Sequence, residues 1–492
     1  MQSMQSKQET KKDISVQLEK GMWGWLNRRT GLDDLLRTAL YEPIPGGARF
    51  AYIFGSGLLF IFISQVITGV FLSLYYVPSA DHAHTTVAYI TKAVTAGSFL
   101  RSLHAYGASA MVIVLLMHLS QTYIYGAYKG RRELLWISGC VLFALVLGMA
   151  FTGYLLPWDQ RAYFATAVGT NAASEVPLIG ESLKRMMRGG TEMGTLTISR
   201  FFVAHVFLIP ACIFALVASH IFLFRKAGAA GPVTENPYKP EQPAELFYPR
   251  QVLMDLSLTA LLIIGLGLLC FFVPVQLGPA ANPADAQYIP RPEWYYLPIF
   301  QWLKYWHGAL SVIGVLIIPT VLAGAVIALP FFDRSIERRP WKRPIAMGAY
   351  GFLVLGLLGL GLRSQYLDRH DAGVSQQLAK QRNDELEYMS KPFEPELSSA
   401  SLAAANVTLS DPFAAKGKTI FEGQSCNACH GDNGVGTAAA PALTGIAAKF
   451  SPEQVAELFK HPTAKMTAGG MPPVDLPAED LKALIAYLQS LK

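Results

Sequence analysis

Two stretches of the sequence, HAYGASAMVIVLLMH at residues 104–118 and HVFLIPACIFALVASH at residues 205–220, begin and end with histidine and are otherwise almost entirely apolar. The two histidines are 14 residues apart in the first stretch and 15 in the second. These separations are close to four turns of an α-helix, so each pair lies nearly on one helix face, about 21 Å apart along the axis. Imidazoles inside apolar helices are costly and usually functional.

We expect the two stretches to form membrane helices that run in the same direction. His104 then meets His205 near the outer membrane face, and His118 meets His220 near the inner face. Such pairs are suitable axial ligands for two haem irons within a four-helix core. The alternative is a set of unrelated core histidines bonded to backbone, which explains a single histidine well but four matched ones poorly.

Four glycines repeat at the same 14-residue spacing: Gly55 and Gly69, then Gly139 and Gly153. A porphyrin needs bare backbone at its closest approach to a helix, so these glycines fit two stacked haem sites. The alternative is ordinary packing, because glycine is common in membrane helices. Arg101 and Arg200 lie shortly before the outer histidines, where they would bind haem propionates or serve as ordinary interfacial arginines.

The composition excludes an ordinary soluble enzyme and a disordered protein. Of 492 residues, 52% are hydrophobic and only 15% are charged, and the mean hydropathy is +0.30; soluble domains have about a quarter charged residues. The net charge of +6 does not indicate a nucleic-acid partner, since Lys and Arg gather in the cytoplasmic loops of membrane proteins. Seven runs approach the roughly 20 apolar residues that a bilayer requires: residues 50–77, 104–125, 134–156, 201–224, 252–273, 310–332 and 345–362.

We therefore predict an all-α protein, with a seven-helix transmembrane bundle that binds two haems b and a small all-α domain after it. The predicted regions are a cytoplasmic amphipathic segment (1–49), a four-helix dihaem core (50–230), a three-helix region (231–365), a linker or surface helix (366–410) and a C-terminal domain (411–492). Lys and Arg are concentrated before the first run and after the even-numbered ones. The positive-inside rule then places the N-terminus in the cytoplasm of a bacterial cell and the C-terminal domain outside its cytoplasmic membrane.

The C-terminal domain contains CNACH at residues 426–430, which is the Cys-x-x-Cys-His motif of covalent haem c attachment. Cys426 and Cys429 would form thioethers to the porphyrin, and His430 would bind its iron. Met471, in a Gly-Gly-Met-Pro-Pro loop, is the expected second axial ligand, with Met466 as the competing choice. A disulfide or half a zinc site is the alternative for the cysteine pair, but the sequence has no second such pair.

Over about residues 20–365 the sequence resembles cytochrome b of the quinol–cytochrome c reductase family, the cytochrome bc complexes. Besides the four histidines, the resemblance rests on FGSGLLFIFISQVITGVFLSLYYVP (54–78), GYLLPWDQ (153–160), SRFFVAH (199–205) and PEWYYLP (292–298). The 15-residue spacing of His205 and His220 and the sequence of the loop after residues 134–156 look like the photosynthetic branch of this family. In that branch a four-helix protein and a three-helix subunit IV are separate chains, whereas here both are joined. That branch attaches an extra haem to a cysteine, which corresponds to Ile53 here. We therefore expect no third membrane haem attached in that way.

The resemblance implies an outer quinol-oxidising pocket formed by Pro292, Glu293, Trp294, Tyr295, Tyr154 and Pro157. Oxidation of a quinol releases two protons, and Glu293 is suited to accept one of them. The alternative is an interfacial aromatic belt, which explains the aromatic residues but not the glutamate. For an inner quinone-reducing site, Asp255 matches an acidic residue that some family members use, and Arg225 is a second candidate; both could instead be helix-end charges that meet water.

The resemblance implies a subunit of a proton-translocating quinol–cytochrome c reductase with its electron acceptor fused to it. One electron from quinol would go to a partner iron–sulfur protein of Rieske type and then to the haem c. The other would cross through the two haems b to quinone on the inner side. The family works as a homodimer, and the downstream acceptor would be a cytochrome c or a terminal oxidase.

Two other classes of function remain open at this point. A dihaem membrane anchor with a cytochrome c tail would conduct electrons for another oxidoreductase without splitting the electron pair, but it needs no outer quinol pocket. A transporter could use intramembrane histidines to relay protons, but the paired spacing and the Cys-x-x-Cys-His motif argue against it.

Overall fold

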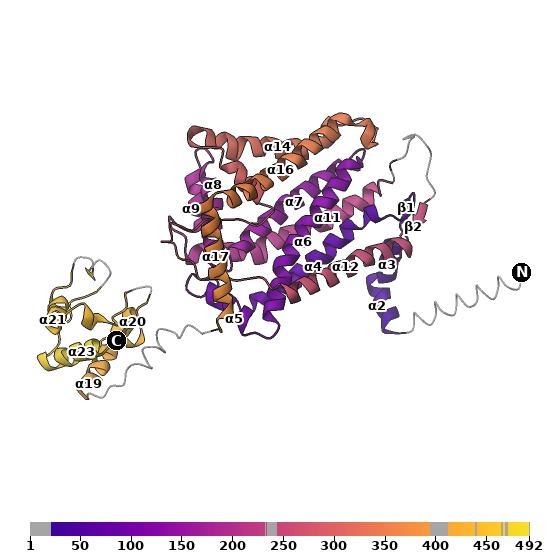
Figure 1. The fold of residues 1–492 in the computed structure, drawn as a ribbon. Helices are drawn as coiled ribbons and strands as arrows, with labels where there is room; N and C mark the ends of the chain where they lie inside the picture. Colours follow the sequence, from indigo (N-terminus) through magenta and orange to yellow (C-terminus); the bar gives the residue numbers. More distant parts are fainter. Residues whose placement is uncertain are drawn as a thin grey trace, which may run out of the picture. The chain divides into compact units, whose positions relative to one another are not determined.

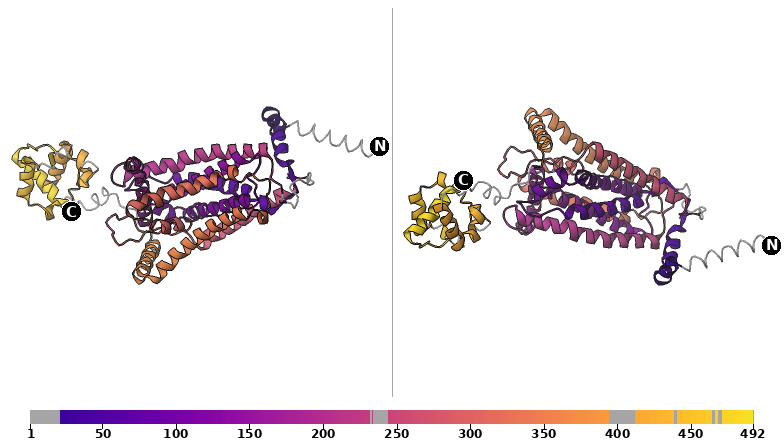
Figure 2. Two further views of the ribbon diagram at one scale, coloured as in Figure 1. Left: turned by 90° about the horizontal axis from the view of Figure 1, so that it is seen from above. Right: turned by 90° about the horizontal axis from the view of Figure 1, so that it is seen from below.

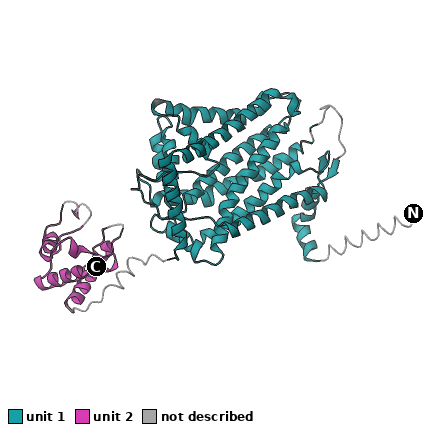
Figure 3. Ribbon diagram, in the orientation of Figure 1, with its two compact units in different colours: residues 1–393 teal, residues 394–492 magenta. Residues whose placement is uncertain are grey.

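The computed structural model describes residues 21–231, 233, 244–393, 412–437, 440–463, 466–467 and 471–491. The chain divides into two compact units, Met1–Phe393 and Glu394–Lys492 (Figure 3). The first 20 residues of the predicted amphipathic segment, the last part of the predicted linker (394–410) and residue 411 lie outside the described residues.

Within the described residues, six helical segments are long and apolar enough to cross a membrane. They are α4 (Phe54–Ser73), α6 (Gly97–Ile124), α7 (Glu133–Tyr154), the continuous segment Thr195–Ala227, α12 (Arg250–Phe272) and α16 (Pro344–His370). Each overlaps one of the predicted apolar runs, and Figures 1 and 2 show them running side by side. The prediction of an all-α membrane bundle is confirmed for these six runs.

The segment Thr195–Ala227 contains a widened turn. Helix α10 (Thr195–Val203) continues through a π-helical turn (Ala204–Leu208) into α11 (Ile209–Ala227). Pro210, the second residue of α11, has no N–H to donate to the helix ladder, which explains why the regular α pattern is interrupted in the turn before it.

The sixth predicted run, residues 310–332, differs from the prediction because it is not one continuous helix. It consists of a π-helical turn (Ile313–Ile317), α14 (Ile318–Ile327) and α15 (Leu329–Phe332). Pro319 and Pro330 each stand near the start of one of these helices, where the missing N–H costs least. The longest apolar piece, Ile313–Ile327, is shorter than the other spans.

The bundle packs around α6 and α7. Helix α6 lies against α4, α7 and α12, while α7 lies against α6, α11 and α14. A buried apolar layer fills the centre of the bundle: Ile61, Phe62, Met111, Val114, Leu142 and Ile213. The two stretches that carry the histidines, on α6 and on the segment α10–α11, thus border this common core.

Short elements cover the two ends of the bundle (Figure 1). One end, which we call the α17 end, carries α5 (Ala83–Lys92), α8 (Gln160–Ser174), α9 (Gly180–Arg188), α13 (Leu297–Leu303) and α17 (Ala372–Ser390). The opposite end, the β1 end, carries α2 (Met22–Thr30), α3 (Leu32–Leu40) and a small antiparallel ladder. In this ladder β1 (Pro43–Pro45) pairs with β2 (Ala244–Leu246), with Ile44 opposite Glu245.

The first part of the predicted linker is helical and belongs to the membrane unit. Helix α16 extends to His370, and α17 follows it after Asp371, whose side chain accepts a hydrogen bond from the amide of Val374. Of the two alternatives for residues 366–410, the surface helix is therefore the one observed up to Ser390.

The second unit is built from α19 (Pro412–Gly423), α20 (Cys426–His430), α21 (Pro452–Lys460) and α23 (Ala478–Ser490). Phe421 and Tyr487 are fully buried at its centre, with ring centroids 5.5 Å apart. A Cβ atom on Gly417 would collide with the carbonyl oxygen of Ala483, so the close crossing of α19 and α23 requires glycine there.

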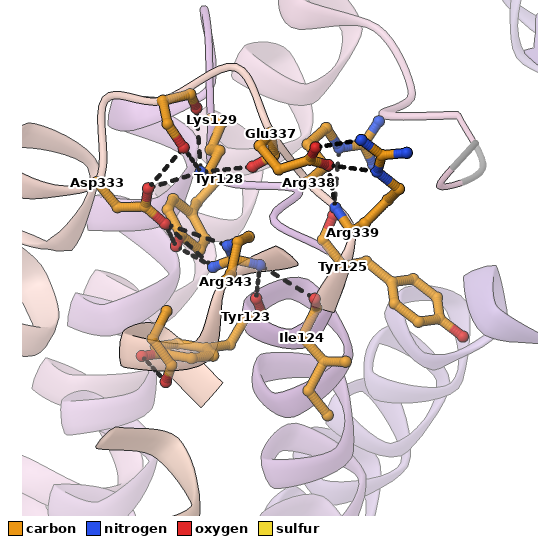
Figure 4. Close-up of polar contacts among 12 residues, drawn as sticks. Tyr123, Ile124, Tyr125, Tyr128, Lys129, Asp333, Glu337, Arg338, Arg339 and Arg343 are labelled. Atoms are coloured by element: carbon orange, nitrogen blue, oxygen red, sulfur yellow. Dashed lines mark hydrogen bonds and ion pairs between the residues drawn. The ribbon is translucent and has the colours of Figure 1, made fainter. Parts of the chain in front are cut away.

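A buried polar cluster at the β1 end joins the loop after α6 to the chain after α15 (Figure 4). Asp333 accepts hydrogen bonds of 2.6 Å from both Lys129 and Tyr128, and Arg343 approaches the same carboxylate at 3.2 Å. The side chains of Lys129 and Arg343 are only 6% and 3% exposed. Burial alone would raise the pKa of Asp333, but the hydrogen bonds from Lys129 and Tyr128 and the nearby cations lower it overall.

We expect Asp333→Asn to destabilise the membrane unit by about 3 kcal/mol, because it leaves two buried cations without their anion. Since the folded-state pKa of Asp333 is lowered, this stabilisation is present at neutral pH and is lost as the pH falls through that pKa. Thermal unfolding of the solubilised chain, followed by tryptophan fluorescence, measures the loss. Asp384→Asn removes an exposed partner of Lys380 and serves as the control, with an expected loss below about 1 kcal/mol. Equal shifts for the two variants would contradict the account.

Candidate functional site

The structure brings His104 of α6 and His205 together at the α17 end of the bundle. Their ring centroids are 6.1 Å apart and their planes are inclined by 78°. Metal–imidazole bonds are about 2 Å long, so two rings bound to one metal ion would have centres roughly 6 Å apart. His205 lies in the π-helical turn Ala204–Leu208, and such turns are frequent at functional sites.

A threonine hydroxyl orients each of these two imidazoles. Thr68 donates its hydroxyl hydrogen to the carbonyl of Ser64 at 2.8 Å, and its oxygen lies 2.9 Å from Nδ1 of His104. Thr152 bonds in the same way to the carbonyl of Gly148, and its oxygen lies 3.1 Å from Nδ1 of His205. A hydroxyl has one hydrogen, so each oxygen accepts the Nδ1–H of the ring and leaves the Nε2 lone pair available to a metal ion.

The second pair repeats part of this arrangement. The hydroxyl of Ser138 donates to the carbonyl of Leu135 at 2.9 Å, and its oxygen lies 2.8 Å from Nδ1 of His220. His118 lies within electrostatic range of His220. His104 and His205 therefore form one of the predicted cross-helix pairs, and the electrostatic interaction of His118 with His220 agrees with the other.

The four predicted glycines each face one of these imidazoles. A Cβ added to Gly69 would lie 3.2 Å from Cε1 of His104, and one added to Gly153 would lie 2.5 Å from that of His205. For Gly139 and Gly55 the corresponding distances are 3.4 Å to His220 and 4.0 Å to His118. Bare backbone thus surrounds each histidine pair, and the residues present fit two porphyrins with bis-imidazole ligation.

In the structure, the two arginines predicted to bind haem propionates, Arg101 and Arg200, donate hydrogen bonds to backbone carbonyls. Arg101 donates to the carbonyls of Val275 and Gln276 at 3.0 and 2.9 Å, which fastens the chain that follows α12 to the start of α6. Arg200 is exposed and donates to the carbonyl of Met186. These contacts favour structural roles for both arginines.

A cavity of about 290 Å³ lies at the α17 end, and Tyr154, Pro292, Glu293 and Trp294 line it. Burial raises the pKa of Glu293, and the positive charge of Arg161 opposes this shift. Arg161, Tyr288 and Arg291 line the same cavity, as do four residues of α17: Leu378, Gln381, Arg382 and Glu385. Tyr295 packs behind Trp294, with ring centroids 5.4 Å apart. Neither Tyr295 nor Pro157 lines this cavity.

The two predicted inner-site residues lie at the β1 end and have different partners. Arg225, in the last turn of α11, forms an ion pair with Glu42 and donates to the carbonyl of Thr38. Asp255 of α12 accepts a hydrogen bond of 2.9 Å from Gln251, which is almost fully buried. In the described part of the chain, no hydrogen bond or ion pair joins Arg225 to Asp255.

The second unit presents the predicted haem c residues on a one-turn helix. Cys426 and Cys429 are both free thiols, three residues apart on α20. Nδ1 of His430 lies 2.9 Å from the carbonyl oxygen of Pro441, which leaves Nε2 available to an iron. Met471, the expected second ligand, packs against the apolar core of this unit. The donor set fits a covalently attached haem.

Sequence reasoning missed two groups of residues. The hydroxyls of Thr68, Ser138 and Thr152 each directly precede one of the predicted glycines, so a repeated hydroxyl–glycine pair was a usable signal. Arg161 and Glu385 are 224 residues apart, and no local pattern connects them.

Comparison with known families agrees with this geometry. The family described as "Cytochrome b/b6/petB" matches residues 40–228, "Cytochrome b(C-terminal)/b6/petD" matches residues 280–379, and "Cytochrome c" matches residues 414–492. The matches cover both halves of the membrane unit and the second unit separately.

Similar proteins carry related names. "Cytochrome b/c1" of Bradyrhizobium diazoefficiens is 33% identical over 68% of this chain and 49% of its own length, so the chain spans about half of that relative. "Menaquinol:cytochrome c reductase cytochrome b subunit" of Bacillus subtilis is 38% identical over 43% of this chain and 98% of its own length. "Cytochrome bc complex cytochrome b subunit" of Chlorobaculum thiosulfatiphilum is 34% identical over 68% of this chain and 78% of its own.

A solved structure described as "Hyperthermophilic respiratory Complex III" shares the fold, with a TM-score of 0.63 over 75% of this chain and 98% of that one at 24% identity. Together with the six membrane helices and the three matched families, these relatives fix the family. The chain belongs to the cytochrome b family of the bc-type quinol–cytochrome c reductases, as a multi-pass, haem-carrying membrane cytochrome b that ends in a cytochrome c domain.

Proposed function

We propose that the chain oxidises quinol in the cavity at the α17 end and passes electrons both to its own cytochrome c domain and across the membrane. One observation carries this proposal. Gly153 faces His205, and the next residue, Tyr154, lines the cavity that contains Glu293. The quinol cavity and the nearer histidine pair are therefore adjacent along one helix end.

The cofactors of the proposal are two noncovalent haems b and one haem c. His104 with His205, and His118 with His220, would hold the haems b, while Cys426 and Cys429 would attach the haem c. His430 and Met471 would be its axial ligands. When bound, these groups supply one-electron redox chemistry between the two membrane faces and the acceptor domain.

Glu293 would accept a proton as quinol is oxidised. Burial in a partly enclosed cavity raises the pKa of Glu293, which makes its carboxylate a better proton acceptor than an exposed glutamate. Trp294 and Tyr154 would confine the quinol ring between them and exclude water from the reacting hydroxyl. Asp255 and Arg225, at the β1 end, would supply protons and charge to a quinone-reducing site.

The proposal also includes partners and orientation. The N-terminus would face the cytoplasm of a bacterial cell, and the α17 end and the cytochrome c domain would lie outside its cytoplasmic membrane. A Rieske iron–sulfur protein would take the first electron, and a cytochrome c or terminal oxidase would oxidise the haem c. The names of the relatives from Bacillus and Chlorobaculum support quinol as substrate and a multi-subunit bc complex, in which we expect a homodimer. A simple electron conduit would not need the Glu293 cavity.

We expect His104→Leu and His205→Leu to remove the same haem b, and His118→Leu and His220→Leu to remove the other. Loss of either ligand leaves an iron without one axial bond, while the other pair keeps its own ligands. Extractable haem per chain, measured against the covalent haem c as an internal standard, would fall by half. His307→Leu, on an exposed loop, is the control and should lose none. Full haem b content in any of the four variants would contradict the assignment.

We expect Glu293→Gln to slow quinol oxidation by about a hundredfold, since a positioned proton acceptor contributes roughly 10²–10⁴-fold. The wild-type rate should rise as the pH passes the raised pKa of Glu293, because only the carboxylate accepts a proton. The glutamine variant should lack this acidic limb, and Glu293→Asp should retain it with a smaller loss of rate. A glutamine variant with the wild-type rate and pH profile would refute the quinol site.

Two single substitutions in the second unit of the full chain test which methionine is the second axial ligand of the haem c. Met471→Leu should lower its reduction potential and open the iron to cyanide, because thioether ligation favours a high potential. Met466→Leu should change neither property. The reverse result would move the ligand to Met466.

A further inference from the structure

Helix α17 is fixed across the α17 end of the bundle by contacts at several points. Lys92 of α5 donates to the carbonyls of Tyr388 and Lys391, and its ammonium lies 4.0 Å from the centre of the Tyr388 ring. Tyr388, Met389 and Phe393 pack against a buried apolar cluster that contains Val87, Ala88 and Leu277. Figure 1 shows the helix beside α5 and α8. Its position over the cavity is thus part of the folded unit.

Glu385 is the carboxylate that α17 contributes to the lining of this cavity. Arg161 of α8 bonds both oxygens of its carboxylate, at 2.6 and 2.8 Å. Glu385 and Glu293 line the same cavity of about 290 Å³, together with Arg161. The side chain of Glu385 is 14% exposed and that of Arg161 is 41% exposed, so this ion pair also reaches water.

The other charged and titratable groups around Glu385 have different constraints. Asp159, which caps α8, is buried and accepts hydrogen bonds from the amides of Ala162 and Gly278, so both of its oxygens are engaged with backbone. The remaining groups around the cavity are cations or phenols: Arg161, Arg291, Arg382, Tyr154 and Tyr288. Besides Glu293, Glu385 is therefore the carboxylate of this cavity with access to solvent.

We propose that Glu385 of α17 is the outer proton acceptor of the quinol cavity, receiving the proton from Glu293 and releasing it to water beside Arg161. The inference rests on the proposed quinol oxidation. It goes beyond the family resemblance, because Glu385 lies outside residues 280–379 that the family matches.

The proton and electron balance of the step is simple. Oxidation of one quinol yields quinone, two electrons and two protons, and the electrons leave to the redox partners of the proposed reaction. One proton binds a carboxylate oxygen of Glu293 and then moves to a carboxylate oxygen of Glu385. The other proton leaves the quinol for the water outside the cavity without passing through either glutamate. Protonation of Glu385 weakens its pair with Arg161, and the positive charge of Arg161 then favours release of that proton to water. Both glutamates return to carboxylates for the next quinol.

The test uses the full chain in its purified complex and follows quinol oxidation against pH. Glu385→Gln should lower kcat about tenfold, less than loss of a direct proton acceptor, with little change in KM because Glu385 does not confine the quinol ring. Glu385→Asp should restore much of kcat and the acidic limb of the pH profile, since it keeps a carboxylate. A purely structural role for the Arg161 pair would make the shorter Asp side chain as slow as Gln.

Two further variants complete the design. Glu387→Gln, on the same helix with its side chain exposed and paired with Lys391, is the matched control and should leave kcat unchanged. The double variant Glu293→Gln/Glu385→Gln should be no slower than Glu293→Gln alone, because both residues act on one proton. A multiplicative loss would overturn the relay.

The outcomes separate this inference from the proposed function. If Glu293→Gln is slow and Glu385→Gln has wild-type kcat and pH profile, the relay is wrong and the quinol site stands. If Glu293→Gln itself behaves as wild type, the quinol site fails, and the relay fails with it.

Discussion

Four imidazoles must keep a defined orientation inside an apolar bundle, and the rest of the membrane unit depends on how this is done. Hydroxyls of Thr68, Thr152 and Ser138 accept the Nδ1–H of three of the rings and so leave the Nε2 lone pair of each ring available to a metal ion. The glycine that follows each hydroxyl keeps the backbone clear at the same place. One pair of neighbouring residues thus sets the tautomer of a ring and the space beside it. His118 differs, because the residue before Gly55 is Phe54.

The second half of the membrane unit positions the quinol cavity against this core. The chain after α15 is held at the β1 end by the cluster around Asp333, and α16 then returns to the α17 end. There the segment at Glu293 meets Tyr154, the last residue of α7. Helix α17 forms one wall of this cavity, and the four-helix core does not supply that wall. The fold therefore places the Glu293 carboxyl and a histidine pair at the same end of the bundle.

Periodicity and local motifs predicted most of what is local to one helix. The 14- and 15-residue spacings predicted that the histidines pair between helices, and the Cys-x-x-Cys-His motif predicted that Cys426, Cys429 and His430 lie together in the second unit. Local patterns could not predict contacts between distant segments. Arg101 donates a hydrogen bond to a loop more than 170 residues away, and Arg161 forms an ion pair with Glu385, which is 224 residues away. The apolar run at 310–332 predicted a span but not its division, since hydropathy does not register the missing N–H groups of Pro319 and Pro330.

The central claim is that two noncovalent haems lie between paired histidines of one chain that also carries a covalent haem. Haem content per chain in the purified intact complex tests it most directly, with acid–acetone extraction separating the two kinds of pigment. The account predicts two extractable haems and one that remains bound to the polypeptide. One extractable haem per chain, or none that stays bound, would contradict it.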